Sequence, residues 1–134
     1  MRGDASSDGF WSFSLRLYAR PEVPPACLAL QDEGGADVNL VLFLLYLADR
    51  GRLLDATEIA GLERATRVWR VQVVEPLRNV RRVLKTDVDA FTQARTAAFR
   101  DEVKRIELGA EKLEQSTLEA LAPATTAGAP APSR

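Results

Sequence analysis

The chain has 134 residues, of which 46% are hydrophobic and 28% charged, with a net charge of −1, no histidine and one cysteine. This composition is typical of a soluble globular chain of about one domain. The lack of histidine excludes the usual Ser-His-Asp and Cys-His nucleophilic sites and, with a single cysteine, disfavours zinc and iron-sulfur centres, so we expect no catalytic residue, no metal and no cofactor.

The first predicted helix covers about residues 9–19 and follows a flexible N-terminus at 1–8, where a serine or aspartate can cap it. Pro21 ends this helix, and a second begins with two prolines in its first turn, over about 24–32. The first helix concentrates aromatic residues that suit either the core or an interface, namely Phe10, Trp11, Phe13 and Tyr18.

The stretch from Val38 to Ala48 contains one polar residue, Asn39, in eleven positions. It is too short to cross a bilayer, which requires about 20 apolar residues, so we expect no membrane span. A helix that is apolar all round is buried on every side, which predicts a central helix over about 38–50. Asp37 is expected to cap this helix, and Gly51 to close it in the left-handed conformation.

The next helical pattern begins at Asp55 or Thr57 as its cap, and apolar residues then recur at spacings of three, four and seven up to Leu84. Pro76 interrupts this pattern. Because proline removes a backbone hydrogen bond and clashes with the preceding turn, it predicts a kink or a split near Val74 and Glu75.

A last helix is expected over about 88–122 with Asp87 as its cap, followed by a disordered Ala/Pro/Thr-rich tail at 123–134. Its apolar residues form a heptad-like seam of Phe99, Val103, Ile106, Ala110, Leu113 and Thr117. The sequence as a whole predicts an all-α fold without a sheet: a single domain over 9–122, built as a compact bundle of five or six helices around the buried central helix.

Residues 64–86 carry seven basic side chains and one acidic one, in contrast to the acidic segments on either side. Such a face either binds phosphate groups or an acidic protein surface, or is solvated and pairs with the chain's own carboxylates. The chain is not basic overall and has no recognition motif, so we expect no nucleic-acid binding. The basic residues are Arg64, Arg67, Arg70, Arg78, Arg81, Arg82 and Lys85.

Three sequence boxes occur in order over roughly residues 10–86: FWSFSLRLY, CLALQDEGGADVNLVLFLLYLA and VWRVQVVEPLRNVRRVLK. Together they resemble a bacterial family of short all-helical proteins that is catalogued as a domain of unknown function. The resemblance leaves out the last helix and the tail. It implies a helical fold in a bacterial, cytoplasmic protein, which agrees with the single cysteine, and it carries no activity, cofactor or catalytic residue.

We expect a non-enzymatic protein-interaction or adaptor module that binds a protein partner or a second copy through the basic face or the last helix. The alternative is a small anionic-ligand binding protein or a cofactor-free enzyme, with a polar cluster beside the central helix as its site. Glu75 and Arg78 are also spaced to form a salt bridge along their helix. The candidate binding residues are Gln31, Asp32, Asp37, Asn39, Glu75, Arg78, Arg82, Trp11 and Trp69.

Overall fold

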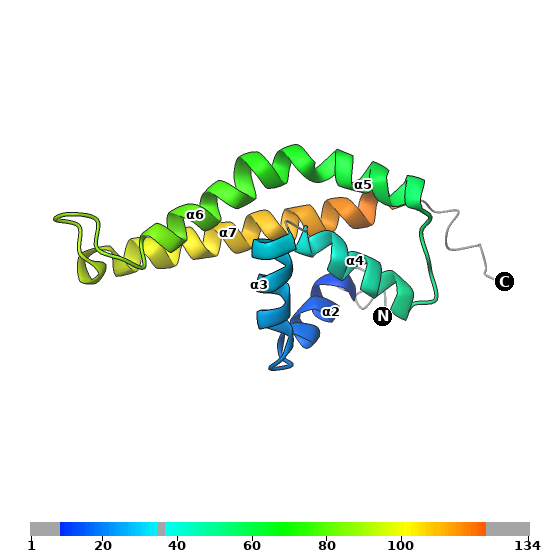
Figure 1. Ribbon diagram of the computed structural model, residues 1–134, viewed down its shortest axis with the longest axis horizontal. Helices are drawn as coiled ribbons and strands as arrows, with labels where there is room; N and C mark the ends of the chain where they lie inside the picture. The colour runs from blue at the N-terminus through cyan, green and yellow to red at the C-terminus, as the bar shows by residue number, and fades with distance from the viewer. Residues whose placement is uncertain (1–8, 35–36, 123–134) are drawn as a thin grey trace. The chain divides into compact units, whose positions relative to one another are not determined.

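A computed structural model describes residues 9–34 and 37–122 of the chain, and the side chains of residues 32–34 lie outside this description. The described part is helical and contains no sheet, with one isolated bridge between Val88 and Phe91. The predicted all-α class is confirmed. The elements (Figure 1) are α2 (Gly9–Tyr18), α3 (Val23–Gly34), α4 (Val38–Asp49), α5 (Ala56–Trp69), the π-helical η1 (Arg70–Val74), α6 (Glu75–Val83) and α7 (Gln93–Leu121).

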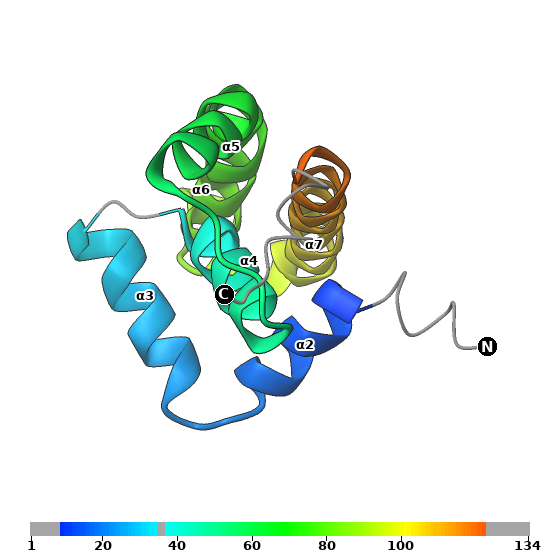
Figure 2. The same ribbon diagram turned by 90° about the vertical axis from the view of Figure 1, so that its right-hand side faces the viewer.

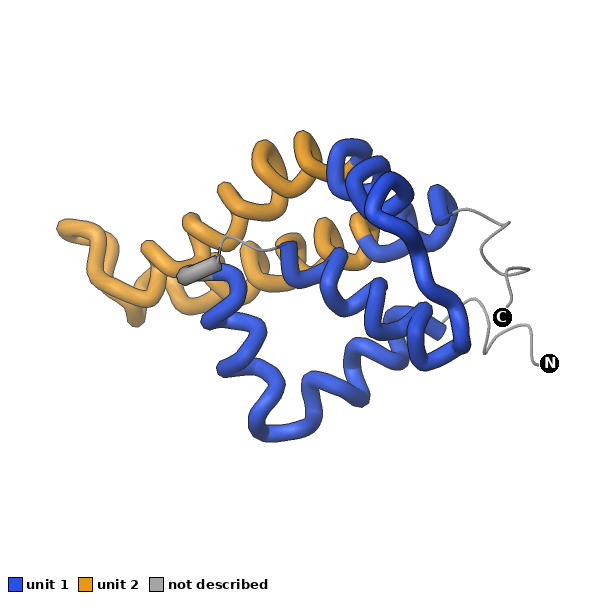
Figure 3. Tube along the Cα trace, turned by 45° about the vertical axis from the view of Figure 1, so that its right-hand side comes forward, with its two compact units in different colours: residues 1–65, 115–134 blue, residues 66–114 orange. Residues whose placement is uncertain are grey.

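Contacts divide the chain into two compact units (Figure 3), one formed by residues 1–65 and 115–134 and the other by residues 66–114. Both boundaries between the units fall inside helices, in α5 and in α7. The expected N-terminal cap at residues 6–8 and the expected tail at 123–134 lie outside the described residues.

The core of the first unit forms around α4, with α2 and α3 both in contact with it (Figure 2). The ring of Phe10 packs against two aromatic rings of α4, with centroids 5.0 Å from Phe43 and 5.3 Å from Tyr46. Such ring pairs stabilise a core beyond the area that they bury. The buried residues of this core are Phe10, Cys27, Val38, Leu40, Leu42, Phe43, Tyr46, Leu47, Leu62 and Leu118.

Helix α4 supplies most of this core, as the apolar stretch predicts. Its burial is not complete on every side, however, because Leu45 is 48% exposed. Of the N-terminal aromatic residues, Phe10 is buried and Phe13 packs on the ring of Tyr46, whereas Tyr18 is exposed. The core interpretation therefore holds for the residues that face α4. Cys27 is a buried thiol of the same core.

Both ends of α4 are closed by the residues that the sequence indicates. The carboxylate of Asp37 accepts hydrogen bonds from the backbone N–H groups of Asn39 (3.1 Å) and Leu40 (3.4 Å). At the other end Gly51 has a φ of 78°, a conformation that glycine adopts without a side-chain clash. The N–H of Arg52 then donates to the carbonyl of Leu47 over 2.8 Å, which satisfies a carbonyl of the last turn.

The helical segment after α4 begins with a capping box and continues past the proline without leaving helical geometry. Asp55 and Glu58 exchange backbone-to-side-chain hydrogen bonds of 2.9 and 2.8 Å, so Asp55 is the cap. The expected interruption takes the form of η1, a π-helical stretch directly before α6. At its end the N–H of Glu75 donates to the carbonyl of Arg70, five residues back. The wider turn accommodates Pro76, which has no N–H to donate.

The last helix begins at Gln93, five residues later than expected. Val88 and Phe91 exchange two backbone hydrogen bonds of 2.9 and 2.8 Å around Asp89, whose φ is 51°, and this tight turn precludes a helix there. Asp87 still serves the helix terminus, because its carboxylate accepts the N–H of Gln93 over 2.8 Å. The prediction of the helix start was wrong. Asp87 is also not the N-cap residue, because the hydroxyl of Thr92, directly before α7, accepts the N–H of Arg95 over 3.3 Å.

Gly9 makes a close approach that an added methyl group would disturb. A Cβ atom at this position would overlap the hydroxyl of Tyr46 and lie 3.2 Å from its Cζ atom. Because Tyr46 is packed in the core, we expect Gly9→Ala to lower the free energy of unfolding by about 1–3 kcal/mol. The measurement is urea denaturation of the purified chain.

Gly61→Ala is the matched control, because the nearest atom to its added Cβ lies 3.9 Å away. This helix-interior change should raise the free energy of unfolding by about 0.5–1 kcal/mol through helix propensity. A gain of stability in both variants would show that the ring of Tyr46 moves aside at no cost.

Candidate functional site

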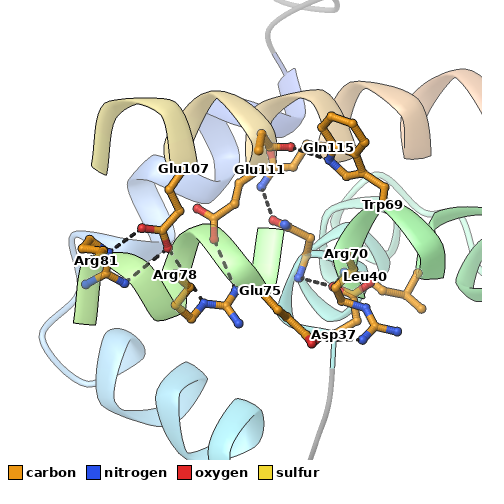
Figure 4. A network of polar contacts seen from close by, with 12 residues as sticks. Asp37, Leu40, Trp69, Arg70, Glu75, Arg78, Arg81, Glu107, Glu111 and Gln115 are labelled. Carbon is orange, nitrogen blue, oxygen red and sulfur yellow. Dashed lines mark hydrogen bonds and ion pairs between the residues drawn. The ribbon is translucent and has the colours of Figure 1, made fainter. Parts of the chain in front are cut away.

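Helix α6 and the following helix α7 form an antiparallel hairpin in the second unit (Figure 1). Along one edge of this hairpin lie two arginines of α6 and two glutamates of α7, which we call the charged edge (Figure 4): Arg78, Arg81, Glu107 and Glu111. Arg81 donates two hydrogen bonds to the carboxylate of Glu107. Its Nε atom donates to Oε1, and its Nη2 atom donates to Oε2 over 3.3 Å. Arg78 reaches Oε2 of the same carboxylate over 3.8 Å and Glu111 over 3.5 Å.

The electrostatics of the charged edge follow from burial and from these pairs. The hydrogen bond to Glu107 raises the pKa of Arg81, so this guanidinium stays charged. Burial raises the pKa of Glu111, and the nearby charge of Glu107 raises it further, against the opposing effect of Arg78. The edge thus pairs two arginines with two glutamates, of which Glu111 gives up its proton less readily than a free glutamate.

Glu75 and Arg78 do not form the salt bridge that their spacing suggests, so this prediction was wrong. Glu75 pairs instead with Arg70 across the π-helical stretch, with 3.2 Å between Oε2 and Nη1. Arg78 turns toward α7 because two carboxylates lie there. A pair within one helix is worth only a few tenths of a kcal/mol, so partners on a neighbouring helix can outweigh it.

Several basic side chains of residues 64–86 form ion pairs with carboxylates of the chain itself. Arg70, Arg78 and Arg81 pair with its own carboxylates, and Arg67 and Arg82 also have interaction partners. Of the two interpretations of this face, these pairs agree with the one in which it pairs with the chain's own carboxylates.

In the first unit, Asn39 joins a buried polar group between three helices. The amide nitrogen of Gln115 on α7 donates to Oδ1 of Asn39 over 3.0 Å and to the hydroxyl of Ser14 on α2 over 3.2 Å. Asn39 therefore reaches a neighbouring helix, as its place in the first turn of α4 suggests. Neither Ser14 nor Gln115 was among the predicted site residues. Both are buried, and a polar side chain on a buried face is the signal that points to them.

The other candidate residues have separate environments. Gln31 and Trp11 are half-buried in the first unit, and the side chain of Asp32 lies outside the described residues. Asp37 caps α4. The expected polar cluster would join residues 31–39 to Arg78 and Arg82, which belong to different units, and it stays a prediction.

The opposite edge of the α6–α7 hairpin is apolar. Each residue of an α-helix is turned by about 100° from the one before it. In the direction of rotation of the chain, Arg81 therefore lies about 100° and Arg78 about 160° from Val80 on α6. In the same direction of rotation, Glu107 lies about 100° and Glu111 about 140° from Ile106 on α7. Because the helices are antiparallel, the same sense of rotation leads to the same edge on both. The ion pairs therefore place the apolar side chains together along the other edge, here called the apolar edge: Val80, Val83, Phe99, Ile106 and Leu113.

Trp69 ties the segment before η1 to α7, because its indole N–H donates to the carbonyl of Ala110 over 3.0 Å. The predicted seam of α7 is right in part. Val103 and Ala110 are buried, whereas Phe99, Ile106 and Leu113 are exposed. The predicted seam contains all six residues, and the spacing does not indicate which of them face α6.

The family of this chain follows from its similarity to a known family model. A family model described as "Protein of unknown function (DUF2390)" matches residues 9–118. The chain belongs to this family. The match extends beyond the three boxes, which end at residue 86, and so includes α6 and α7 up to residue 118. No curated protein matches the chain, and no solved structure matches it.

The described residues contain neither a membrane-spanning helix nor a metal-binding group of side chains. None of the helices described there combines the length and the apolar character needed to cross a membrane. No group of three or more cysteine or carboxylate side chains placed to hold a metal ion occurs among them.

Glu107 pairs with both arginines of the charged edge, and its loss would leave Arg81 without this carboxylate and Arg78 with Glu111 alone. We expect Glu107→Ala to lower the free energy of unfolding by about 3 kcal/mol, as for a broken buried ion pair. The control is Glu102→Ala on the same helix, where the pair with Arg105 is exposed and should be worth less than about 1 kcal/mol. Equal losses in chemical denaturation would contradict a special role for the charged edge.

The raised pKa of Glu111 predicts a pH dependence of stability. Above the pKa of a free glutamate the folded chain holds this proton more tightly than the unfolded chain, so stability falls as the pH rises through the raised pKa. Glu111→Gln cannot titrate and escapes this loss. Its Tm relative to the wild type should therefore be higher at about pH 7 than at about pH 4. A relative Tm that falls with pH would show that the attraction of Arg78 outweighs burial.

Proposed function

We propose that this chain is a non-enzymatic protein-interaction module and that the apolar edge of the α6–α7 hairpin is its binding surface. The exposure of the edge carries the proposal. On α7, Phe99 is 60% exposed, Ile106 50% and Leu113 57%, and on α6, Val80 is 41% and Val83 45% exposed. Contiguous exposed apolar side chains of this kind mark interaction surfaces.

The spacing of the α7 residues supports a helical partner. Phe99, Ile106 and Leu113 recur every seven residues, the period at which two helices pack along a common seam. The edge is also well anchored, because the ion pairs of Arg81 and Arg78 on the opposite side hold the two helices in register. A rigid apolar surface binds with a smaller loss of conformational entropy than a flexible one.

The charged edge supports a small anionic ligand less well. Its arginines are already paired with Glu107 and Glu111, so an anion would have to displace a carboxylate of the chain itself. This arrangement favours a structural role for the charged edge over catalysis or anion binding. The buried thiol of Cys27 and the family resemblance support a bacterial cytoplasm as the place of action.

Site-specific photo-crosslinking in living cells tests the proposal. A photoreactive amino acid at Ile106 should give protein adducts after illumination, because this position lies in the middle of the α7 row. The control position is Leu28 on α3, which is also 50% exposed but belongs to the other unit. Absence of adducts at position 106, or equal yields at both positions, would contradict the proposal.

A further inference from the structure

We infer that the partner of the apolar edge is a second copy of this chain, so that two α6–α7 hairpins form a four-helix bundle. This inference rests on the proposed function and names its partner. The second unit buries few apolar side chains of its own, namely Val74, Leu84, Val103 and Ala110. A two-helix hairpin has one thin seam, whereas a four-helix bundle encloses a core between two such hairpins.

The two rows of the apolar edge differ in size in a way that suits self-pairing. The α6 row consists of the small side chains of Val80 and Val83, whereas the α7 row carries the large ones of Phe99, Ile106 and Leu113. A two-fold axis parallel to the helices places the α6 row of each copy over the α7 row of the other. In the register set by Arg81 and Glu107, Ile106 lies level with Val80 and Val83. This large side chain then packs against small ones at both contacts, which is the interdigitation that close-packed cores require.

The same axis gives every helix antiparallel neighbours. It retains the direction of each helix, so α6 of one copy runs antiparallel to α7 of the other, as it does within its own hairpin. The result is the alternating up-and-down arrangement of four-helix bundles. The short turns at residues 84–92 of the two copies lie at the same end.

The extent of the edge and its border agree with such an interface. Five side chains at about half exposure leave on the order of 400 Å² of apolar surface per copy, which can form the apolar centre of an interface of about 800 Å² per partner. On α7 the outer border of the edge is charged with both signs, since Arg105 and Glu102 form an exposed pair at 2.7 Å. A border of mixed charge does not repel an identical border.

Sedimentation equilibrium of the full chain tests the inference. The wild type is expected to be a dimer, and Ile106→Glu should raise its dimerisation Kd at least about 100-fold, because a charge is then buried in each half of the interface. Leu28→Glu, at a position of equal exposure, should leave the Kd within about two-fold of the wild type, as a surface change does. Circular dichroism establishes that each variant is folded, and Phe99→Gln replaces Ile106→Glu if the latter unfolds.

The orientation is tested with a spin label at Ala90, in the exposed turn between the two helices. The proposed axis brings the two labels to one end of the bundle. The reversed pairing would separate them by about the length of the hairpin, roughly 30 Å. A long label distance in a dimer overturns the proposed arrangement.

The failure of this inference is distinct from failure of the proposed function. A monomeric wild type that gives adducts at Ile106 with other proteins overturns the second copy as partner and leaves the interaction module in place. A monomer that gives no adducts overturns both. A dimer that Ile106→Glu leaves intact overturns the assignment of the apolar edge as its interface.

Discussion

Burial of a carboxylate costs free energy unless cations and hydrogen bonds replace the water that it loses, and Glu107, only 5% exposed, is such a carboxylate. Arg81 and Arg78 of α6 replace this water around the carboxylate of Glu107, and Arg81 does so with two hydrogen bonds. Their reach fixes both the register of α6 against α7 and the rotation of each helix about its axis. A purely apolar seam tolerates rotation and sliding, whereas this arrangement is directional, and the placement of every other side chain on the hairpin follows from it.

The apolar edge is a consequence of that rotation. With Arg78 and Arg81 turned to one side, Val80 and Val83 must lie on the other, and the same holds for Glu107 against Ile106 on α7. The hairpin thereby pairs four of its charged side chains between its two helices and leaves five apolar side chains exposed. This is the reverse of the usual division for a soluble helix. An outward apolar row that the chain's own charges hold in place is consistent with a surface for another helix.

Much of the fold can be predicted from local chemistry. The caps at Asp37 and Asp55 and the left-handed Gly51 depend on neighbouring residues only, so the sequence indicates them directly. Features that depend on distant residues were missed. Arg78 bypasses Glu75 for carboxylates about thirty residues further along the chain. Helix α7 starts later than the sequence indicates because the backbones of Val88 and Phe91 form hydrogen bonds with each other.

The candidate site also contains features that depend on distant residues and that the sequence therefore does not indicate. A seven-residue period relates the apolar residues of α7, but periodicity is symmetric and does not show which of them are buried against the chain's own helix. Glu107 decides this, because its spacing from Val103 and Ala110 places it on their side and its charge requires the arginines. The family match reaches residue 118 and so includes α7 up to that residue. The carboxylates that orient the hairpin and the row that they turn outward therefore both lie within the segment that the family model matches.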